Sequence, residues 1–171
     1  MGFPVALALK WAAKSLPTII EHLKKIDLDR TSAITVENWI GDANILMRKK
    51  DDYFDCGGFD DTPSTAIEGG QEDAWGVAKK PGAYGVCGAI KYDVTGVDEY
   101  GVVFVFYNPQ TGSNRGYATW SKHDAKHVFK SWEDNDFSYP GSSTQNDIHI
   151  SASAGSGNHN QITFGIAPVK A

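Results

Sequence analysis

Two histidines and two cysteines are the side chains of this chain best suited to chemistry. His123 and His127 are four positions apart, a spacing that puts two imidazoles on one helical face and suits a metal ion. Asp124 stands where a zinc-protease helix has Glu, and no third ligand is identifiable, so we expect a solvated helix face. No local motif makes Cys56 or Cys87 a nucleophile. They are two free thiols or one disulfide, and we favour free thiols.

An acidic run and a glycine-rich run are the other candidates for a site. The acidic run lacks the spacing of a known calcium loop, and we expect a solvated loop there. SAGSGNHN, residues 153–160, does not match a phosphate-binding loop and is typical of a hairpin turn. We therefore expect no enzymatic activity, no cofactor and no metal. The acidic run contains Asp51, Asp52, Asp55, Asp60 and Asp61.

Aromatic residues gather late in the chain, several of them in expected loops. Exposed aromatic side chains beside Gly and Pro are costly unless something binds them. Tyr and Trp suit a membrane interface, and aromatic rings hold choline headgroups by cation–π attraction. A well-packed sandwich edge is the alternative, and the sequence leaves the two equally open. The residues are Tyr107, Tyr117, Trp120, Trp132, Phe137 and Tyr139.

The elements that must position these residues are mostly strands. A length of 171 residues predicts one domain, residues 1–171, and abundant Gly and aromatics favour strands after the first thirty residues. A net charge of −5 lacks the basic footprint of a nucleic-acid-binding protein. The order of elements predicts a mainly β fold, a β-sandwich flanked by two short α-helices. We expect a half-buried strand at 31–40, a second strand that begins at 44–48, and further strands at 74–80, 85–94, 100–107, 148–152 and 161–166. The strands at 85–94 and 100–107 should form one hairpin, with the apolar run at 102–106 central in its sheet, and those at 148–152 and 161–166 a second hairpin. We expect a helix at 123–132, loops at 62–73, 108–116 and 134–145, and a charged segment at 49–61 in which Tyr53 and Phe54 are strand residues near a bend.

The pattern of residues 1–30 predicts an N-terminal amphipathic arm and helix. Apolar residues recur every three or four positions, with Lys10, Lys14 and Lys24 on the opposite face. Pro17 would cost about 3 kcal/mol inside a helix but is tolerated in a first turn, where Ser15 is a plausible N-cap. We therefore expect a docked helix at 16–25 and a separate arm at 1–14. As one helix, residues 3–26 would be about 36 Å long, enough to cross a bilayer core of about 30 Å.

Short motifs along most of the chain resemble the actinoporins, pore-forming cytolysins first known from sea anemones. They include SLPTIIEHLKKIDLDRTSAITVEN at 15–38, YFDCG at 53–57, and GVVF at 101–104 followed by Pro109, Tyr117 and Trp120. The resemblance implies a β-sandwich with two helices and an aromatic pocket for phosphocholine headgroups such as that of sphingomyelin. It also implies self-oligomerisation on the membrane and insertion of the N-terminal helix.

The resemblance also implies roles for particular residues. The headgroup pocket would contain Cys56, Pro109, Tyr117 and Trp120, and the candidate membrane-contact aromatics are Tyr107, Trp132, Phe137 and Tyr139. The membrane-inserting residues would be Phe3, Val5, Leu7, Leu9, Trp11 and Leu16.

Two departures favour a second interpretation. Cys56 stands where the family has Ser, and this chain is acidic where the family is often basic. They favour a non-lytic, lectin-like module that binds glycans or lipids on the same scaffold, as fungal fruit-body lectins of similar fold bind sugars. No stretch resembles a signal peptide or an unbroken membrane span. We expect a protein that is secreted or soluble in the cytosol before it reaches a target cell membrane.

Overall fold

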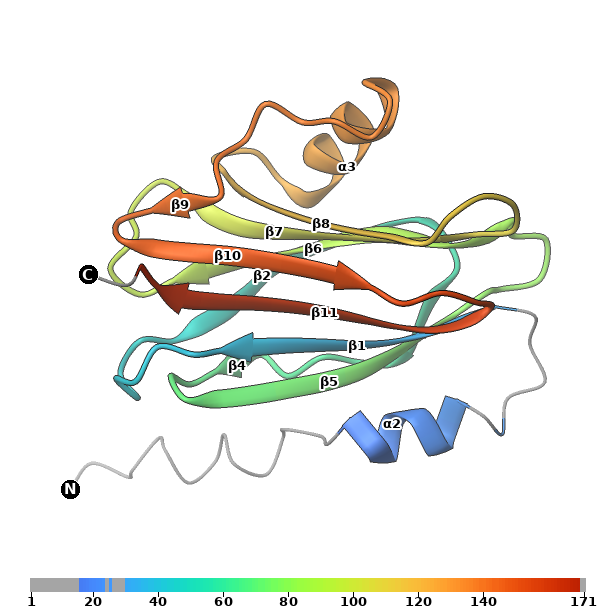
Figure 1. Cartoon of the computed structure of the whole chain (residues 1–171), viewed down its shortest axis with the longest axis horizontal. Coiled ribbons are helices and arrows are strands. Elements are labelled where there is room, and N and C mark those ends of the chain that lie inside the picture. The colour runs from blue at the N-terminus through green and yellow to red at the C-terminus, as the bar shows by residue number, and fades with distance from the viewer. Residues whose placement is uncertain (1–15, 24, 26–29, 170–171) are drawn as a thin grey trace.

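Two β-sheets packed face to face form the body of the protein (Figure 1). The computed structural model of the chain describes residues 16–23, 25 and 30–169. The first sheet has the order β3-β5-β1-β11-β10-β9 and the second the order β4-β2-β6-β7-β8. The strands are β1 (Thr31–Asn38), β2 (Met47–Cys56), β3 (Gly58–Asp61), β4 (Ala66–Ile67), β5 (Gln71–Ala78), β6 (Gly85–Val94), β7 (Gly101–Pro109), β8 (Arg115–Ser121), β9 (Thr144–Gln145), β10 (Ile148–Ala154) and β11 (His159–Pro168).

The core lies between the sheets and follows the two-residue period of the strands. Alternate residues of β7 point inward, and Phe104 stacks on Phe164 of β11 with ring centroids 4.8 Å apart. β6 and β7 form the predicted antiparallel hairpin, with Gly85 opposite Pro109 and Asp93 opposite Gly101. The predicted last hairpin is also present, as β10 and β11.

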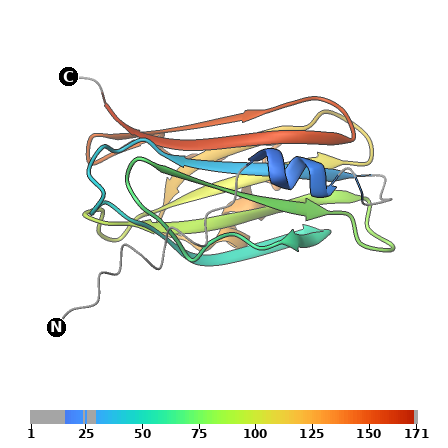
Figure 2. The same cartoon turned by 90° about the horizontal axis from the view of Figure 1, so that it is seen from below.

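One helix covers the outer face of each sheet, which confirms the predicted β-sandwich with two short helices. α2 (Leu16–Leu23) lies across β1 and β5, and α3 (Ala125–Asp134) lies over the second sheet (Figures 1 and 2). Pro17 is in the first turn of α2, as predicted, whereas Ser15 and the arm at 1–14 lie outside the described residues. No helix in the described part of the chain is long and apolar enough to cross a membrane.

β1 is buried on both faces, so the prediction of a half-buried strand was wrong. The cause is α2, because Ile19 and Leu23 pack on Ala33, which points away from the inter-sheet core. The strand also ends at Asn38, earlier than predicted. Trp39 therefore lies outside the strand and is 59% exposed.

The acidic run was predicted to be a solvated loop, which was wrong, because its residues lie in β2 and β3. The predicted strand residues Tyr53 and Phe54 do lie in β2. β2 pairs with β6 through a ladder that shifts register twice, and the backbone hydrogen bonds outweigh the poor strand propensity of Asp. Cationic side chains offset the charge, as Lys49 pairs with Asp52 and Lys130 with Asp55. β8 was not predicted, and it begins inside the predicted loop at 108–116.

Candidate functional site

Two hairpin loops and one loop that joins the two sheets meet at one end of the sandwich, at the right of Figure 1, which we call the loop end. The backbone N–H of Gln110 donates to the carbonyl of Tyr84 at 2.6 Å. The side-chain amide of Asn114 donates to the carbonyls of Gly155 at 3.1 Å and Gly157 at 2.8 Å. These bonds tie the loops into one surface. The loops are 79–84, 110–114 and 155–158.

A pocket of about 680 Å³ opens at the loop end, and we call it the loop-end pocket. Its walls come from the end of β2, the loop at 79–84, the end of β7 and the last turn of α3. Two carboxylates, two phenols and two thiols contribute to its lining. The groups belong to Asp55 and Glu133, Tyr84 and Tyr107, and Cys56 and Cys87.

Gly57 allows the chain to turn at the pocket floor between β2 and β3. Its φ of +81° is in the left-handed region, which favours glycine. A Cβ at this position would lie 2.7 Å from the carbonyl oxygen of Ala78, closer than real contacts. A glycine is therefore required to bring Cys56 beside the loop at 79–84.

At one wall of the pocket, the ammonium group of a lysine lies between two carboxylates. Lys130 Nζ lies 2.6 Å from Asp55 Oδ1 and 3.1 Å from Glu133 Oε2. The hydrogen bond to Asp55 is the main cause that raises the pKa of Lys130. Burial is the main cause that raises the pKa of Tyr107 above the ordinary value of a phenol. Two carboxylates against one ammonium leave this wall with negative charge.

The two cysteines are both free thiols, as predicted, and they lie side by side. Cys56 of β2 is directly opposite Cys87 of β6 in the antiparallel ladder. A hydrogen bond between the thiols is the main cause that lowers the pKa of Cys56 and raises that of Cys87, to which burial also contributes.

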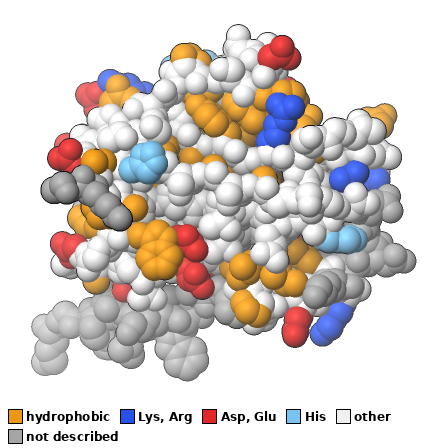
Figure 3. All heavy atoms as spheres, viewed as in Figure 1, with side chains coloured by type: hydrophobic (Ala, Val, Ile, Leu, Met, Phe, Trp, Pro, Cys, Tyr) orange, Lys and Arg blue, Asp and Glu red, His pale blue; other side chains and the backbone are white. Residues whose placement is uncertain are grey.

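A second, shallower site of about 350 Å³ lies between β8 and α3, and we call it the aromatic hollow. The ring of Tyr117 stacks on Trp132 at 6.0 Å, and Phe137 meets Trp132 edge-on at 5.0 Å. The guanidinium carbon of Arg115 lies 3.6 Å from the centroid of Phe137, so a cation already covers this ring. Figure 3 shows hydrophobic side chains gathered beside basic ones in the region of α3.

Tyr107 connects the two sites. Its ring meets Trp132 at 5.8 Å and Phe137 at 5.2 Å, and the same residue lines the loop-end pocket. Tyr139, the fourth predicted membrane-contact aromatic, is half-buried, and its backbone carbonyl accepts a hydrogen bond from the phenol of Tyr117 at 3.1 Å. The four aromatics are therefore brought together around α3.

The predicted headgroup residues divide among three places. Cys56 and Pro109 line the loop-end pocket, whereas Tyr117 lines the aromatic hollow. Trp120 is 2% exposed and packs in the inter-sheet core. Residues three apart on a strand point to opposite faces, so Tyr117 and Trp120 cannot share one pocket. Leu16 lies half-buried in α2, and the other predicted membrane-inserting residues lie outside the described residues.

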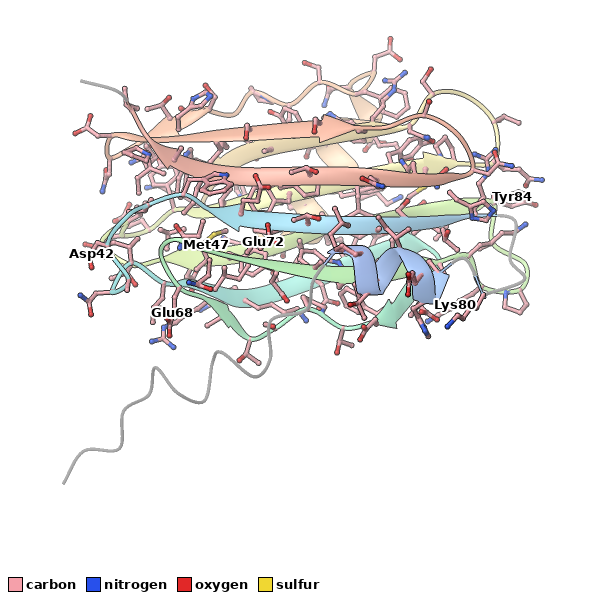
Figure 4. The ribbon with its side chains drawn as sticks, turned by 60° about the horizontal axis from the view of Figure 1, so that its bottom comes forward. Asp42, Met47, Glu68, Glu72, Lys80 and Tyr84 are labelled. Carbon is pink, nitrogen blue, oxygen red and sulfur yellow. The ribbon has the colours of Figure 1, made fainter. Side chains whose placement is uncertain are left out.

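Tyr84, Asp55 and Glu133 line the loop-end pocket but were not predicted as headgroup residues, and Asp55 was named only in the acidic run. Tyr84 is 78% exposed at its rim, and a tyrosine soon after the Pro81–Gly82 turn was the available signal. No sequence signal joined Asp55 to Glu133, because the two residues are 78 positions apart in the sequence. Figure 4 shows Tyr84 and Lys80 at the loop end and Asp42 at the opposite end.

The histidine pair lies apart from these sites. The rings of His123 and His127 stack at 4.1 Å, and both residues are exposed. α3 begins two positions later than predicted because the side chain of Asp124 caps it, accepting from the His127 N–H at 2.7 Å. Within residues 16–23, 25 and 30–169, no three His, Cys, Asp or Glu side chains are grouped to hold a metal ion.

Comparisons with known proteins identify the fold. No protein-family model and no curated protein matches this chain in sequence. The crystal structure of the lipid-binding protein Nakanori is similar, with a TM-score of 0.73 and 18% identity over 89% of this chain and 78% of that one. The structure of RahU protein in complex with Tris is similar with a TM-score of 0.54 and 12% identity, over 84% and 98% of the two chains. The chain therefore shares the β-sandwich of these proteins over most of its length.

Proposed function

We propose that this protein binds membrane lipids, with its loop end against the bilayer and a phosphocholine headgroup in the loop-end pocket. The observation that supports the proposal most directly is the lining of the pocket, which combines carboxylates with tyrosine rings. An exposed tyrosine, Tyr84, lies at its rim. A quaternary ammonium is attracted both to aromatic faces and to negative charge. The shared fold with a protein described as lipid-binding supports the proposal.

The pocket offers a complement to each half of the headgroup. The choline group would lie near Asp55 and Glu133, with Tyr107 as an aromatic wall. The phosphate would accept hydrogen bonds from the Thr111 hydroxyl at the rim. Tyr84 would lie at the membrane interface, where a half-apolar ring with a polar tip is favoured.

The proposal extends to pore formation. In this extension, bound copies assemble on the membrane, and the N-terminal segment leaves the sandwich to enter the bilayer. The amphipathic pattern of residues 1–26 supports this step. The attachment of α2 through only two fully buried side chains, Ile19 and Leu23, also supports it.

Vesicle binding tests the headgroup proposal with a matched pair of variants. Tyr84→Ala removes an exposed aromatic side chain at the loop end. Trp39→Ala is the control, because it removes an exposed aromatic side chain that directly follows the C-terminal end of β1. We expect Tyr84→Ala to weaken co-sedimentation with phosphatidylcholine or sphingomyelin vesicles about tenfold, for a contact worth about 1–2 kcal/mol. Trp39→Ala should bind like the original protein. Equal losses in the two variants, or no binding to any choline lipid, would contradict the proposal.

Dye release tests the extension separately. We expect sphingomyelin vesicles to lose an enclosed dye, and deletion of residues 1–14 to abolish release while vesicle binding persists. Absence of leakage at protein concentrations far above those that saturate binding would refute pore formation but leave lipid binding intact.

Glycan binding is the second candidate function. A polar hollow of about 430 Å³ at the loop end favours it, because Arg30, Asn114 and Asn158 offer both donors and acceptors there. A glycan array run beside a lipid overlay separates the two candidates. Selective retention on a glycan with no lipid binding would favour the lectin-like function.

A further inference from the structure

We propose that Cys56 and Cys87 are a redox modification site, at which a small hydroperoxide converts two free thiols into one intramolecular disulfide. The site lies in the loop-end pocket, but its chemistry does not depend on what that pocket binds. Three observations carry the inference: the pairing of the two strands, the access that the pocket provides, and the different surroundings of the two thiols.

The strand pairing provides the geometry. Cys56 and Cys87 are directly opposite in the antiparallel ladder of β2 and β6. Opposed residues in such a ladder have Cα atoms about 4.5–5.5 Å apart, within the range of about 4.4–6.8 Å that a disulfide spans. The ladder shifts register between Phe54 and Cys56, and Gly57 follows. The two cysteines therefore lie at an irregular end of the strand, next to a register shift in the ladder.

The pocket provides access from one side. Both cysteines line it, but Cys56 is half-buried whereas Cys87 is 3% exposed. Cys87 also belongs to the buried hydrophobic cluster that contains Ala89, Val105 and Phe129. A small oxidant in the pocket therefore meets Cys56 first, and Cys87 is reached only through its neighbour.

The two thiols also differ in acidity, and this difference favours the same order of reaction, with Cys56 first. The hydrogen bond from Cys87 favours the Cys56 thiolate and lowers the pKa of Cys56, against opposing contributions from burial and the nearby Asp55. That hydrogen bond and burial raise the pKa of Cys87. Because the thiolate is the nucleophile, Cys56 attacks the oxidant and Cys87 resolves the product.

The reaction balances with hydrogen peroxide as the oxidant. The Cys56 thiolate attacks one peroxide oxygen, the O–O bond breaks, and the departing hydroxide takes a proton to become water. Cys56 is then a sulfenic acid. The Cys87 sulfur attacks the Cys56 sulfur, the S–O bond breaks, and hydroxide leaves with the Cys87 proton as a second water. Two thiols are oxidised by two electrons, and one peroxide is reduced to two waters.

The test uses the full-length protein under native conditions. After exposure to hydrogen peroxide, we expect intact-mass spectrometry to show a monomer that has lost two hydrogens, with both alkylation sites lost together. Dithiothreitol should restore both sites. Retention of both alkylatable thiols, or disulfide-linked dimers in place of the monomeric product, would overturn the proposal.

Matched serine variants test the two roles. Cys87→Ser should retain a Cys56 sulfenic acid that dimedone traps. Cys56→Ser should leave Cys87 unmodified, or oxidised at least about tenfold more slowly. Equal oxidation rates in the two variants would overturn the assignment. Peptide mapping of the partly oxidised original protein tests the order in which the two cysteines react without any substitution. Dimedone should label Cys56 and not Cys87.

Discussion

The two helices cover equivalent faces of the sandwich but are attached in different ways. α3 buries four residues, begins at a side-chain cap and places Lys130 between Asp55 and Glu133. α2 buries two residues, and its ion pair joins His22 Nε2 to Asp60 Oδ2 at 2.7 Å. Both helices pack on a sheet, but only α3 contributes to the loop-end pocket and the aromatic hollow.

This difference indicates which helix is able to leave its sheet. Burial of a large apolar side chain contributes about 1.5–3 kcal/mol, so Ile19 and Leu23 together contribute roughly 3–6 kcal/mol. Transfer of a similar apolar surface into acyl chains offsets that loss. Release of α3 would expose Phe129 and Trp132 and dismantle the aromatic cluster. The proposed membrane step therefore involves α2 and leaves α3 in place.

The strongest test of this comparison is Trp132→Ala. The ring contacts Tyr107, Tyr117, Phe129 and Phe137, and the residue is 2% exposed. We expect the free energy of unfolding in urea to fall by about 3–5 kcal/mol, with loss of vesicle binding as Tyr107 loses its support. A loss below about 1 kcal/mol would show that α3 is no more firmly held than α2.

Leu23→Ala tests the attachment of α2. A Cβ on Gly76 would lie 2.9 Å from Leu23 Cδ2, so this side chain sits directly on β5. We expect a loss of about 2–3 kcal/mol in the free energy of unfolding, and faster hydrogen exchange in α2 than in β1. The exposed Glu21→Ala is the control and should change neither. Equal acceleration of exchange in β1 would show that α2 is an inseparable part of the core.

Asp51→Asn tests the start of α3 through pH. Asp51 Oδ2 accepts from the Ala125 N–H at 3.4 Å, and burial is the main cause that raises the pKa of Asp51 above 3.8. The folded protein therefore binds this proton more tightly than the unfolded chain does. The resulting stabilisation is present below the unfolded pKa and is lost as pH rises through the folded pKa.

We therefore expect Asp51→Asn to gain stability relative to the original protein as the pH rises from below 3.8 through the folded pKa of Asp51, by less than about 1 kcal/mol because the carboxyl is partly exposed. Thermal melts across this range measure the difference. A stability difference that does not change with pH would contradict the assignment.

His22→Ala should have the smallest effect. The pair with Asp60 is solvent-exposed, with 55% of the histidine side chain accessible. Exposed pairs contribute about 0–1 kcal/mol, so we expect a loss below about 1 kcal/mol and little change in vesicle binding. A loss as large as that of Leu23→Ala would identify the ion pair, and not the apolar contact, as the main attachment of α2.

The sequence alone determined the elements whose signals are local. The apolar run at 102–106 predicted a central strand, and residues 102–106 of β7 are buried in the second sheet. Pro17 predicted a helix start, and it lies in the first turn of α2. These predictions succeeded because strand period and proline geometry act over a few residues.

Only the tertiary structure decided where the candidate site lies. Strand pairing made a strand of the acidic run, brought Cys56 beside Cys87, and placed Trp120 in the core while Tyr117 faces α3. The loop-end pocket joins β2, the loop at 79–84, β7 and α3, which are far apart in the chain. Register and burial depend on such distant partners. A one-residue change in register reverses the face of every side chain in a strand, and no local pattern encodes that choice.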